Sequence, residues 1–229
     1  MSISIFPITE TFAAEIGAIA LSQPLAASDL KAIRDAFATY AVLIFPAQEL
    51  TVEQHLAFAA NFGPLERTIE IAIGRTKLRT PPEIADVANL NVDGAIWRED
   101  ARRRQYGMLG NRLWHTDSSF KAPSGYASLL YARSIPPIGG HTEFADMRAA
   151  YDALPDSMKR RLHGLIADHS LIYADVSASR TTPRPSKKRS PPSRIRLYER
   201  SRNQAGSRST SRRISARFTG CPTTKWKHC

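Results

Sequence analysis

The chain has 229 residues, enough for one domain with a hydrophobic core or for two small ones. Hydrophobic residues make up 42% and charged residues 23%, as in globular proteins, and the formal net charge is +11. Residues 175–229 hold 15 Lys and Arg against two acidic residues, a net +13, whereas residues 1–174 hold 17 basic and 19 acidic residues, a net −2. The basic charge therefore belongs to one segment, and it does not by itself indicate a nucleic-acid partner.

Cysteine usage and hydropathy exclude further classes. Cys221 and Cys229 both lie in the C-terminal segment, so residues 1–174 contain neither a disulfide framework nor a cysteine-rich zinc site. The start of the chain lacks the basic and long apolar regions of a secretory signal, and no apolar run approaches the roughly 20 residues that span a bilayer. We therefore expect a cytoplasmic protein without a membrane partner.

The first third of the chain predicts alternating helices and strands. Ser28 is placed to cap a helix whose apolar residues have helical spacing; these are Leu30, Ile33, Phe37 and Tyr40. Residues 41–45 form a short apolar run, ended by Pro46, that predicts a buried strand. Thr51 with Gln54 three residues later forms a capping box, which predicts a second helix that Gly63 and Pro64 end.

The middle of the chain is more polar. Residues 65–109 predict a long excursion with one short strand at 87–90, and loops of that length are usually functional lids or disordered. Beyond residue 113 the pattern predicts strands at 127–132 and 142–144. Two helices are then predicted through 147–154 and 158–165.

The character of the chain changes abruptly after Tyr173. Residues 175–229 contain ten Ser and fifteen Lys or Arg, but only five Leu, Ile, Val and Phe combined. A segment of this composition cannot bury enough apolar surface to offset the entropy of ordering it. We therefore predict two parts: a domain at 1–174 and a disordered basic segment at 175–229.

His115 and Asp117 are the residues that indicate chemistry. On a strand, residues i and i+2 point to the same side, so an imidazole and a carboxylate at this spacing can converge on one ion. They supply two of the three ligands of the 2-His-1-carboxylate triad, which holds non-haem Fe(II) and leaves positions open for oxygen chemistry. The tripeptide alone is a weak signal in a chain with six histidines.

Its context strengthens that interpretation. The stretches Asn111 to Phe120, Pro136 to Met147, Phe58 to Leu65 and Asp146 to Leu154 occur in an order that resembles a known family. This is the taurine / 2,4-dichlorophenoxyacetate family of Fe(II)- and 2-oxoglutarate-dependent dioxygenases, and the sequence looks nearest to the aryloxyalkanoate branch. The resemblance covers residues 10 to about 173.

The resemblance implies a mainly β fold with flanking helices, a double-stranded β-helix or jelly roll, incomplete here at its C-terminus. It implies that His115 and Asp117 are iron ligands, that the Thr142 hydroxyl binds a carboxylate of the co-substrate 2-oxoglutarate, and, as a weaker carry-over, that Asn111 lines the substrate pocket. The implied reaction is hydroxylation by O2 of a small anionic organic substrate, coupled to decarboxylation of 2-oxoglutarate to succinate and CO2. A homo-oligomer stays open.

The family also has a distal His as third iron ligand and an Arg for the far carboxylate of 2-oxoglutarate. Nothing after residue 173 matches that pattern, and His228, the only later histidine, has no strand context. Re-reading the codons of residues 179–229 in another frame gives a globular-looking peptide with Val-Tyr-Ile-Ser-Ala-His alternation, which resembles the continuation seen in the family. We therefore predict a frame change near residues 174–178, and a polypeptide that is inactive as written.

Two other functions compete with this interpretation. The basic segment could bind nucleic acid by neutralising phosphates, but only Tyr198, Phe218 and Trp226 could stack on bases, so such a partner is disfavoured. A zinc hydrolase using His115 and Asp117 would lack a third ligand and a nucleophile pattern. Among dioxygenase substrates, aryloxyalkanoates, alkyl sulfates and sulfonates stay open.

Overall fold

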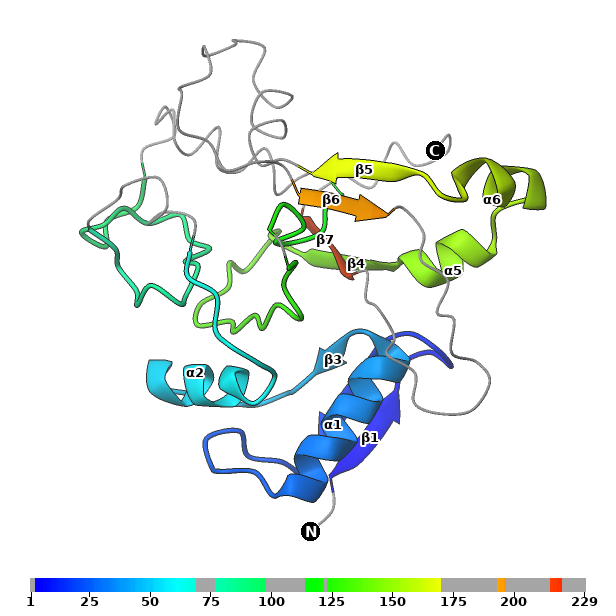
Figure 1. Cartoon of the computed structure of the whole chain (residues 1–229). Helices are drawn as coiled ribbons and strands as arrows, with labels where there is room; N and C mark the ends of the chain where they lie inside the picture. The colour runs from blue at the N-terminus through cyan, green and yellow to red at the C-terminus, as the bar shows by residue number, and fades with distance from the viewer. Residues whose placement is uncertain are drawn as a thin grey trace.

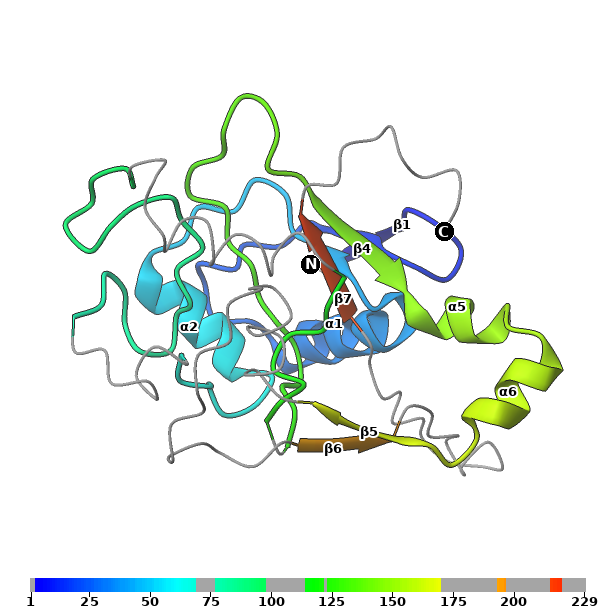
Figure 2. The same cartoon turned by 90° about the horizontal axis from the view of Figure 1, so that it is seen from above.

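The computed structural model describes residues 3–68, 77–97, 114–121, 123–169, 193–196 and 215–219. An N-terminal unit of three strands and two helices lies beside a second group that contains the strands and helices after residue 141 (Figure 1). Helices α2 and α6 lie at opposite sides of the molecule in both views (Figure 2). None of the described helices is long and apolar enough to cross a membrane.

The N-terminal sheet contains three strands in the order β1-β2-β3. Strand β1 (Ser4–Pro7) pairs antiparallel with β2 (Ala14–Gly17), and β2 pairs parallel with β3 (Leu43–Ile44). Parallel neighbours need a crossover connection, and helix α1 (Ala27–Tyr40) supplies it. The strand predicted over 41–45 is thus confirmed only at residues 43 and 44.

Helix α1 begins two residues earlier than a cap at Ser28 predicts. Its N-cap is Ala26, whose methyl side chain cannot accept a hydrogen bond, and Ser28 lies inside the first turn. The prediction that Ser28 caps this helix was therefore wrong, because the backbone turns helical before the serine. At the other end Ala41 is left-handed, with φ of 62°, and its N–H bonds the Phe37 carbonyl at 2.9 Å, which closes the last turn.

Helix α2 (Val52–Ala60) confirms the predicted capping box. The Gln54 N–H donates to the Thr51 hydroxyl at 3.2 Å, and the Gln54 side-chain oxygen accepts the Thr51 N–H at 2.8 Å. Two N–H groups that the helix itself cannot satisfy are paired in this way.

The buried apolar core lies in the N-terminal unit. Along β2 the burial alternates, with Ala14 and Ile16 fully covered and Glu15 exposed, as expected when one face of a strand packs inward. Leu21 forms a buried cluster with Ile33 of α1 and Phe58 of α2. Leu129, from a distant part of the chain, packs against this cluster and joins the later residues to the core.

Residues 127–132, predicted as a strand, have no strand pairing in the described structure. Their side chains still alternate between partly buried and exposed positions along the whole segment. Alternation fixes which face packs inward, but a strand also needs a neighbouring backbone to bond. The second predicted strand, at 87–90, contributes only an isolated bridge between Leu90 and Ile96.

The later elements agree better with the predictions. Strand β4 (Thr142–Asp146) leads directly into helix α5 (Met147–Asp152), followed by α6 (Asp156–Leu162) and β5 (Ile166–His169). These residues match the predicted strand at 142–144 and the two predicted helices, although α6 ends before Leu165.

Two segments of the basic C-terminal part are strands, although its composition predicts disorder. Strand β6 (Ser193–Arg196) pairs antiparallel with β5, and β7 (Ser215–Thr219) pairs antiparallel with β4. Backbone pairing uses the C=O group that every residue carries and the N–H group that every residue except proline carries. An unpaired strand edge can therefore accept a segment of almost any composition.

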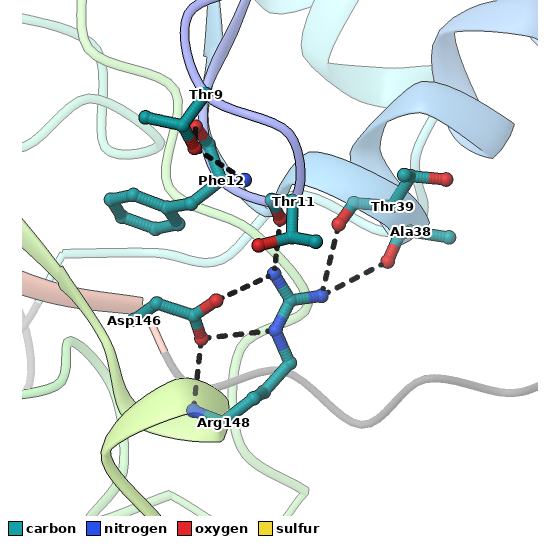
Figure 3. A network of polar contacts seen from close by, with 7 residues as sticks. All are labelled: Thr9, Thr11, Phe12, Ala38, Thr39, Asp146 and Arg148. Atoms are coloured by element: carbon teal, nitrogen blue, oxygen red, sulfur yellow. Dashed lines mark hydrogen bonds and ion pairs between the residues drawn. The ribbon is translucent and has the colours of Figure 1, made fainter. Parts of the chain in front are cut away.

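Arg148 ties the two groups of elements together (Figure 3). Its guanidinium donates to both carboxylate oxygens of Asp146, at 3.0 Å each. The same group donates to the carbonyls of Ala38 and Thr39, at 3.3 and 3.1 Å, and to that of Thr11 at 3.1 Å. The start of α5 is thus bonded to the last turn of α1 and to the loop between β1 and β2.

Candidate active site

His115 and Asp117 lie together, as their spacing predicts. The Nε2 atom of His115 is 3.3 Å from Oδ1 of Asp117, and the two side chains are 29% and 35% exposed. His115 makes a single β-bridge and Asp117 begins a turn, so the backbone is not the regular strand that the sequence suggested. The pair is partly open to solvent, which leaves access for an ion or a small molecule.

The donor set fits a divalent first-row metal. Imidazole nitrogen and carboxylate oxygen are ligands for such ions at about 2.1 Å, so two donors in adjacent positions of one ion lie about 3 Å apart. The observed 3.3 Å is close to that separation. Within the described ranges, no group of three or more His, Cys, Asp or Glu side chains gathers in a metal-binding arrangement.

The turn after Asp117 has an unusual backbone. Ser118 adopts φ of 55°, in the left-handed region that residues other than glycine seldom occupy. Glu66 restrains this turn. Its Oε2 atom accepts a hydrogen bond from the Ser118 hydroxyl at 2.9 Å and forms an ion pair with Lys121. The direction of the chain just beyond the His115–Asp117 pair is therefore fixed by a residue more than 50 positions earlier.

Asp117 has a second polar partner in Ser128. The Ser128 hydroxyl donates to Oδ2 of Asp117 at 3.0 Å, while Oδ1 faces His115. An ionised carboxylate only accepts, so the hydroxyl must be the donor. Sequence reasoning missed both Ser128 and Glu66, since neither belongs to a motif with His115.

The other predicted site residues are Thr142 and Asn111. Thr142 is half-buried at the first position of β4, and its backbone lies opposite Thr219 of β7. Asn111 lies outside the described residues, as do the predicted frame change at 174–178 and His228. The roles proposed for Thr142 and Asn111 stay predictions.

A separate group of side chains surrounds His55 on α2. The centre of its ring lies 5.7 Å from that of Tyr131. The guanidinium of Arg133 lies over the same Tyr131 ring, 5.9 Å from its centre. Burial lowers the pKa of His55, and the positive charge of Arg133 lowers it further, against the opposing effect of a hydrogen bond with the Leu129 backbone. The cluster fixes residues 129–133 against α2, since the Leu50 N–H also donates to the Tyr131 hydroxyl at 3.0 Å.

Comparison with known proteins places this chain in a family. The family described as taurine catabolism dioxygenase TauD, TfdA family, matches residues 4–225. The chain belongs to this family, whose members are 2-oxoglutarate-dependent dioxygenases.

Several curated relatives are named for aryloxyalkanoate substrates. The chain is 41% identical over 169 residues to the alpha-ketoglutarate-dependent 2,4-dichlorophenoxyacetate dioxygenase of Cupriavidus pinatubonensis, covering 74% of this chain and 58% of the relative. It is 36% identical over 179 residues to the (S)-phenoxypropionate/alpha-ketoglutarate-dioxygenase of Sphingobium herbicidovorans, covering 78% and 57%. The chain thus spans somewhat more than half the length of these relatives.

Solved structures show the same likeness. The crystal structure of AAD-2 in complex with Mn(II) and N-oxalylglycine matches with a TM-score of 0.73 and 39% identity, over 86% of this chain and 66% of that one. A taurine dioxygenase from Burkholderia xenovorans matches with a TM-score of 0.56 and 29% identity, over 74% and 54%. The described elements therefore have the fold of this dioxygenase family, and the predicted family, metal and 2-oxoglutarate requirement are confirmed at the level of its members.

Proposed function

We propose that this chain derives from an Fe(II)- and 2-oxoglutarate-dependent dioxygenase that hydroxylates a small anionic aryloxyalkanoate. The observation that carries the proposal is the 3.3 Å approach of His115 Nε2 and Asp117 Oδ1. Relatives named for 2,4-dichlorophenoxyacetate and (S)-phenoxypropionate support the substrate class. The complete protein would be a jelly roll with helices packed outside it.

The chain's own residues would bind and orient the reactants. His115 and Asp117 would hold the metal on one side, and the Thr142 hydroxyl would donate to a carboxylate of 2-oxoglutarate. Asn111 would line the substrate pocket. When bound, Fe(II) with 2-oxoglutarate and O2 supplies the oxidising power for hydroxylation of a C–H bond.

The 229-residue polypeptide has two of the three protein ligands, and we propose that it is inactive as written. A two-ligand site without the Arg for 2-oxoglutarate should bind both metal and co-substrate weakly. The cause would be a frame change near residues 174–178. The curated relatives align over 169 and 179 residues, which is close to the length of the part before the change in composition, whereas the family match extends to residue 225.

The decisive test compares two polypeptides made from one gene. The first is the 229-residue chain, and the second has the frame restored near codons 174–178 and continues through the downstream sequence. Succinate formation is measured with Fe(II), 2-oxoglutarate and 2,4-dichlorophenoxyacetate. We expect turnover only in the restored chain, and we expect His115→Ala to abolish it.

Each outcome has a distinct meaning. Turnover by the 229-residue chain at an ordinary rate, about 1 s⁻¹ or faster, would refute its proposed inactivity. A restored chain that oxidises alkyl sulfates or sulfonates but no aryloxyalkanoate would keep the reaction class and overturn the substrate. Absence of any 2-oxoglutarate consumption by a folded restored chain would overturn the activity itself.

A further inference from the structure

We propose that Ser128 is a positioning residue for the carboxylate of Asp117, a proposal that rests on the metal-binding role of His115 and Asp117. The two oxygens of Asp117 have different neighbours: Oδ1 faces His115 Nε2 at 3.3 Å, and Oδ2 accepts a hydrogen bond from the Ser128 hydroxyl at 3.0 Å. This division presents Oδ1 to an ion beside His115 and holds Oδ2 away from it.

Ser128 can act in this way because its segment is anchored to the core. Residues 127–132 alternate in exposure, so Ser128 lies on one face while Leu129 and Tyr131 lie on the other. Leu129 packs against the cluster of Leu21, Ile33 and Phe58, and the Tyr131 hydroxyl accepts the Leu50 N–H at 3.0 Å. The serine is therefore held at a fixed position relative to the N-terminal unit.

Asp117 itself lies on a segment that is fixed from the opposite direction. The left-handed turn at Ser118 is bonded to Glu66 through the Ser118 hydroxyl and Lys121. The backbone of Asp117 is thus set by Glu66, and the rotation of its carboxylate is set by Ser128. Without the Ser128 hydrogen bond less would oppose rotation of the carboxylate, and Oδ2 could also approach the ion.

The expected effect is moderate, because Ser128 is exposed and Asp117 is 35% exposed, so water competes for Oδ2. Partners that orient a metal ligand typically change metal affinity by 10- to 100-fold, and exposure favours the lower end of that range. We expect Ser128→Ala to weaken metal binding about tenfold.

The test is a Mn(II) titration of the 229-residue chain up to millimolar metal, with free Mn(II) measured by electron paramagnetic resonance. Ser128→Ala should weaken binding about tenfold, whereas Ser128→Thr, which keeps the hydroxyl, should retain it. Ser124→Ala removes an exposed hydroxyl from the same stretch of chain and should leave affinity unchanged. Thermal unfolding should be unaltered in all three variants, because the hydrogen bond lies at the surface.

Asp117→Ala separates the two proposals. If it weakens Mn(II) binding and Ser128→Ala does not, the positioning role is overturned while the metal site stands. Equal weakening by Ser128→Ala and Ser128→Thr also overturns it, since the hydroxyl would then be irrelevant. If Asp117→Ala binds Mn(II) as well as the unaltered chain, or if that chain binds none, the metal site and the role of Ser128 both fail.

Discussion

Arg148 donates a hydrogen bond to the backbone carbonyl of Thr39, 3.1 Å away and 109 positions earlier in the chain. Thr39 lies in the last turn of α1, which contains no basic residue of its own. The last carbonyls of a helix lack partners within it and carry partial negative charge. The guanidinium of Arg148 therefore supplies, from a distant segment, the cation that this helix end lacks.

Replacing Arg148 should destabilise the fold measurably. Arg148→Ala removes the bonds to Ala38, Thr39 and Thr11 and leaves the Asp146 carboxylate, only 9% exposed, without its cation. We expect the free energy of unfolding to fall by about 2 kcal/mol, measured by urea denaturation. Arg160→Ala, at an exposed position of α6, is the matched control and should change it by less than about 0.5 kcal/mol. Equal effects in the two variants would contradict the contacts in Figure 3.

The same ion pair predicts a dependence of stability on acid pH. Burial opposes ionisation of Asp146, but the hydrogen bonds and charge of Arg148 outweigh it and lower the pKa of the carboxyl below its ordinary 3.8. A carboxyl with a lowered folded-state pKa contributes stability that is complete above the unfolded-state pKa. That contribution is lost as the pH falls from about 4 through the folded-state pKa. Asp146→Asn should reduce stability at pH 7 and flatten the profile below pH 4; an unchanged acid slope would count against the pair.

His55 predicts a second pH effect, nearer neutrality. Its pKa is lowered by burial and by Arg133, so the unfolded chain binds a proton more readily than the folded chain does. Stability should therefore be complete above about pH 7 and decrease as the pH falls through the ordinary histidine value near 6.5. Thermal denaturation between pH 8 and 5 should show this decrease, and His55→Gln should reduce it. An equal slope in His55→Gln and in the unaltered chain would contradict the burial of this imidazole.

The capping box of α2 allows a purely local test. Thr51→Ala removes the hydroxyl that accepts the Gln54 N–H, and the cost of losing such a cap is about 1 kcal/mol. Thr39→Ala is a matched control, because that hydroxyl bonds the Asp35 carbonyl inside α1, where such bonds stabilise little. Urea denaturation should rank Thr51→Ala clearly below Thr39→Ala, and the reverse order would refute the role of the box.

Local patterns were the most predictable part of this molecule. Thr51 and Gln54 are three residues apart, so their pairing depends only on helix geometry, and the convergence of His115 and Asp117 likewise follows from adjacent backbone. The Ser28 cap failed although it is also local, because the start of a helix depends on how the preceding chain enters it.

Contacts that require the whole fold could not be predicted. Ser128 meets Asp117 only because Leu129 and Tyr131 hold its segment against the core, and Glu66 meets Ser118 across 52 positions. The strand predicted at 127–132 shows the same limit, since its alternating side chains specify a face and not a partner. Residue types alone carry no information about which distant backbone arrives beside them.

Every buried apolar side chain in the described structure belongs to the first 58 residues: Ala14, Ile16, Leu21, Ile33, Ala36 and Phe58. During synthesis, this packing can be complete while the codons beyond residue 170 are still untranslated. The ribosome would therefore translate an altered later codon when the N-terminal unit can already be folded. Such a change would leave the residues of this packing unaltered.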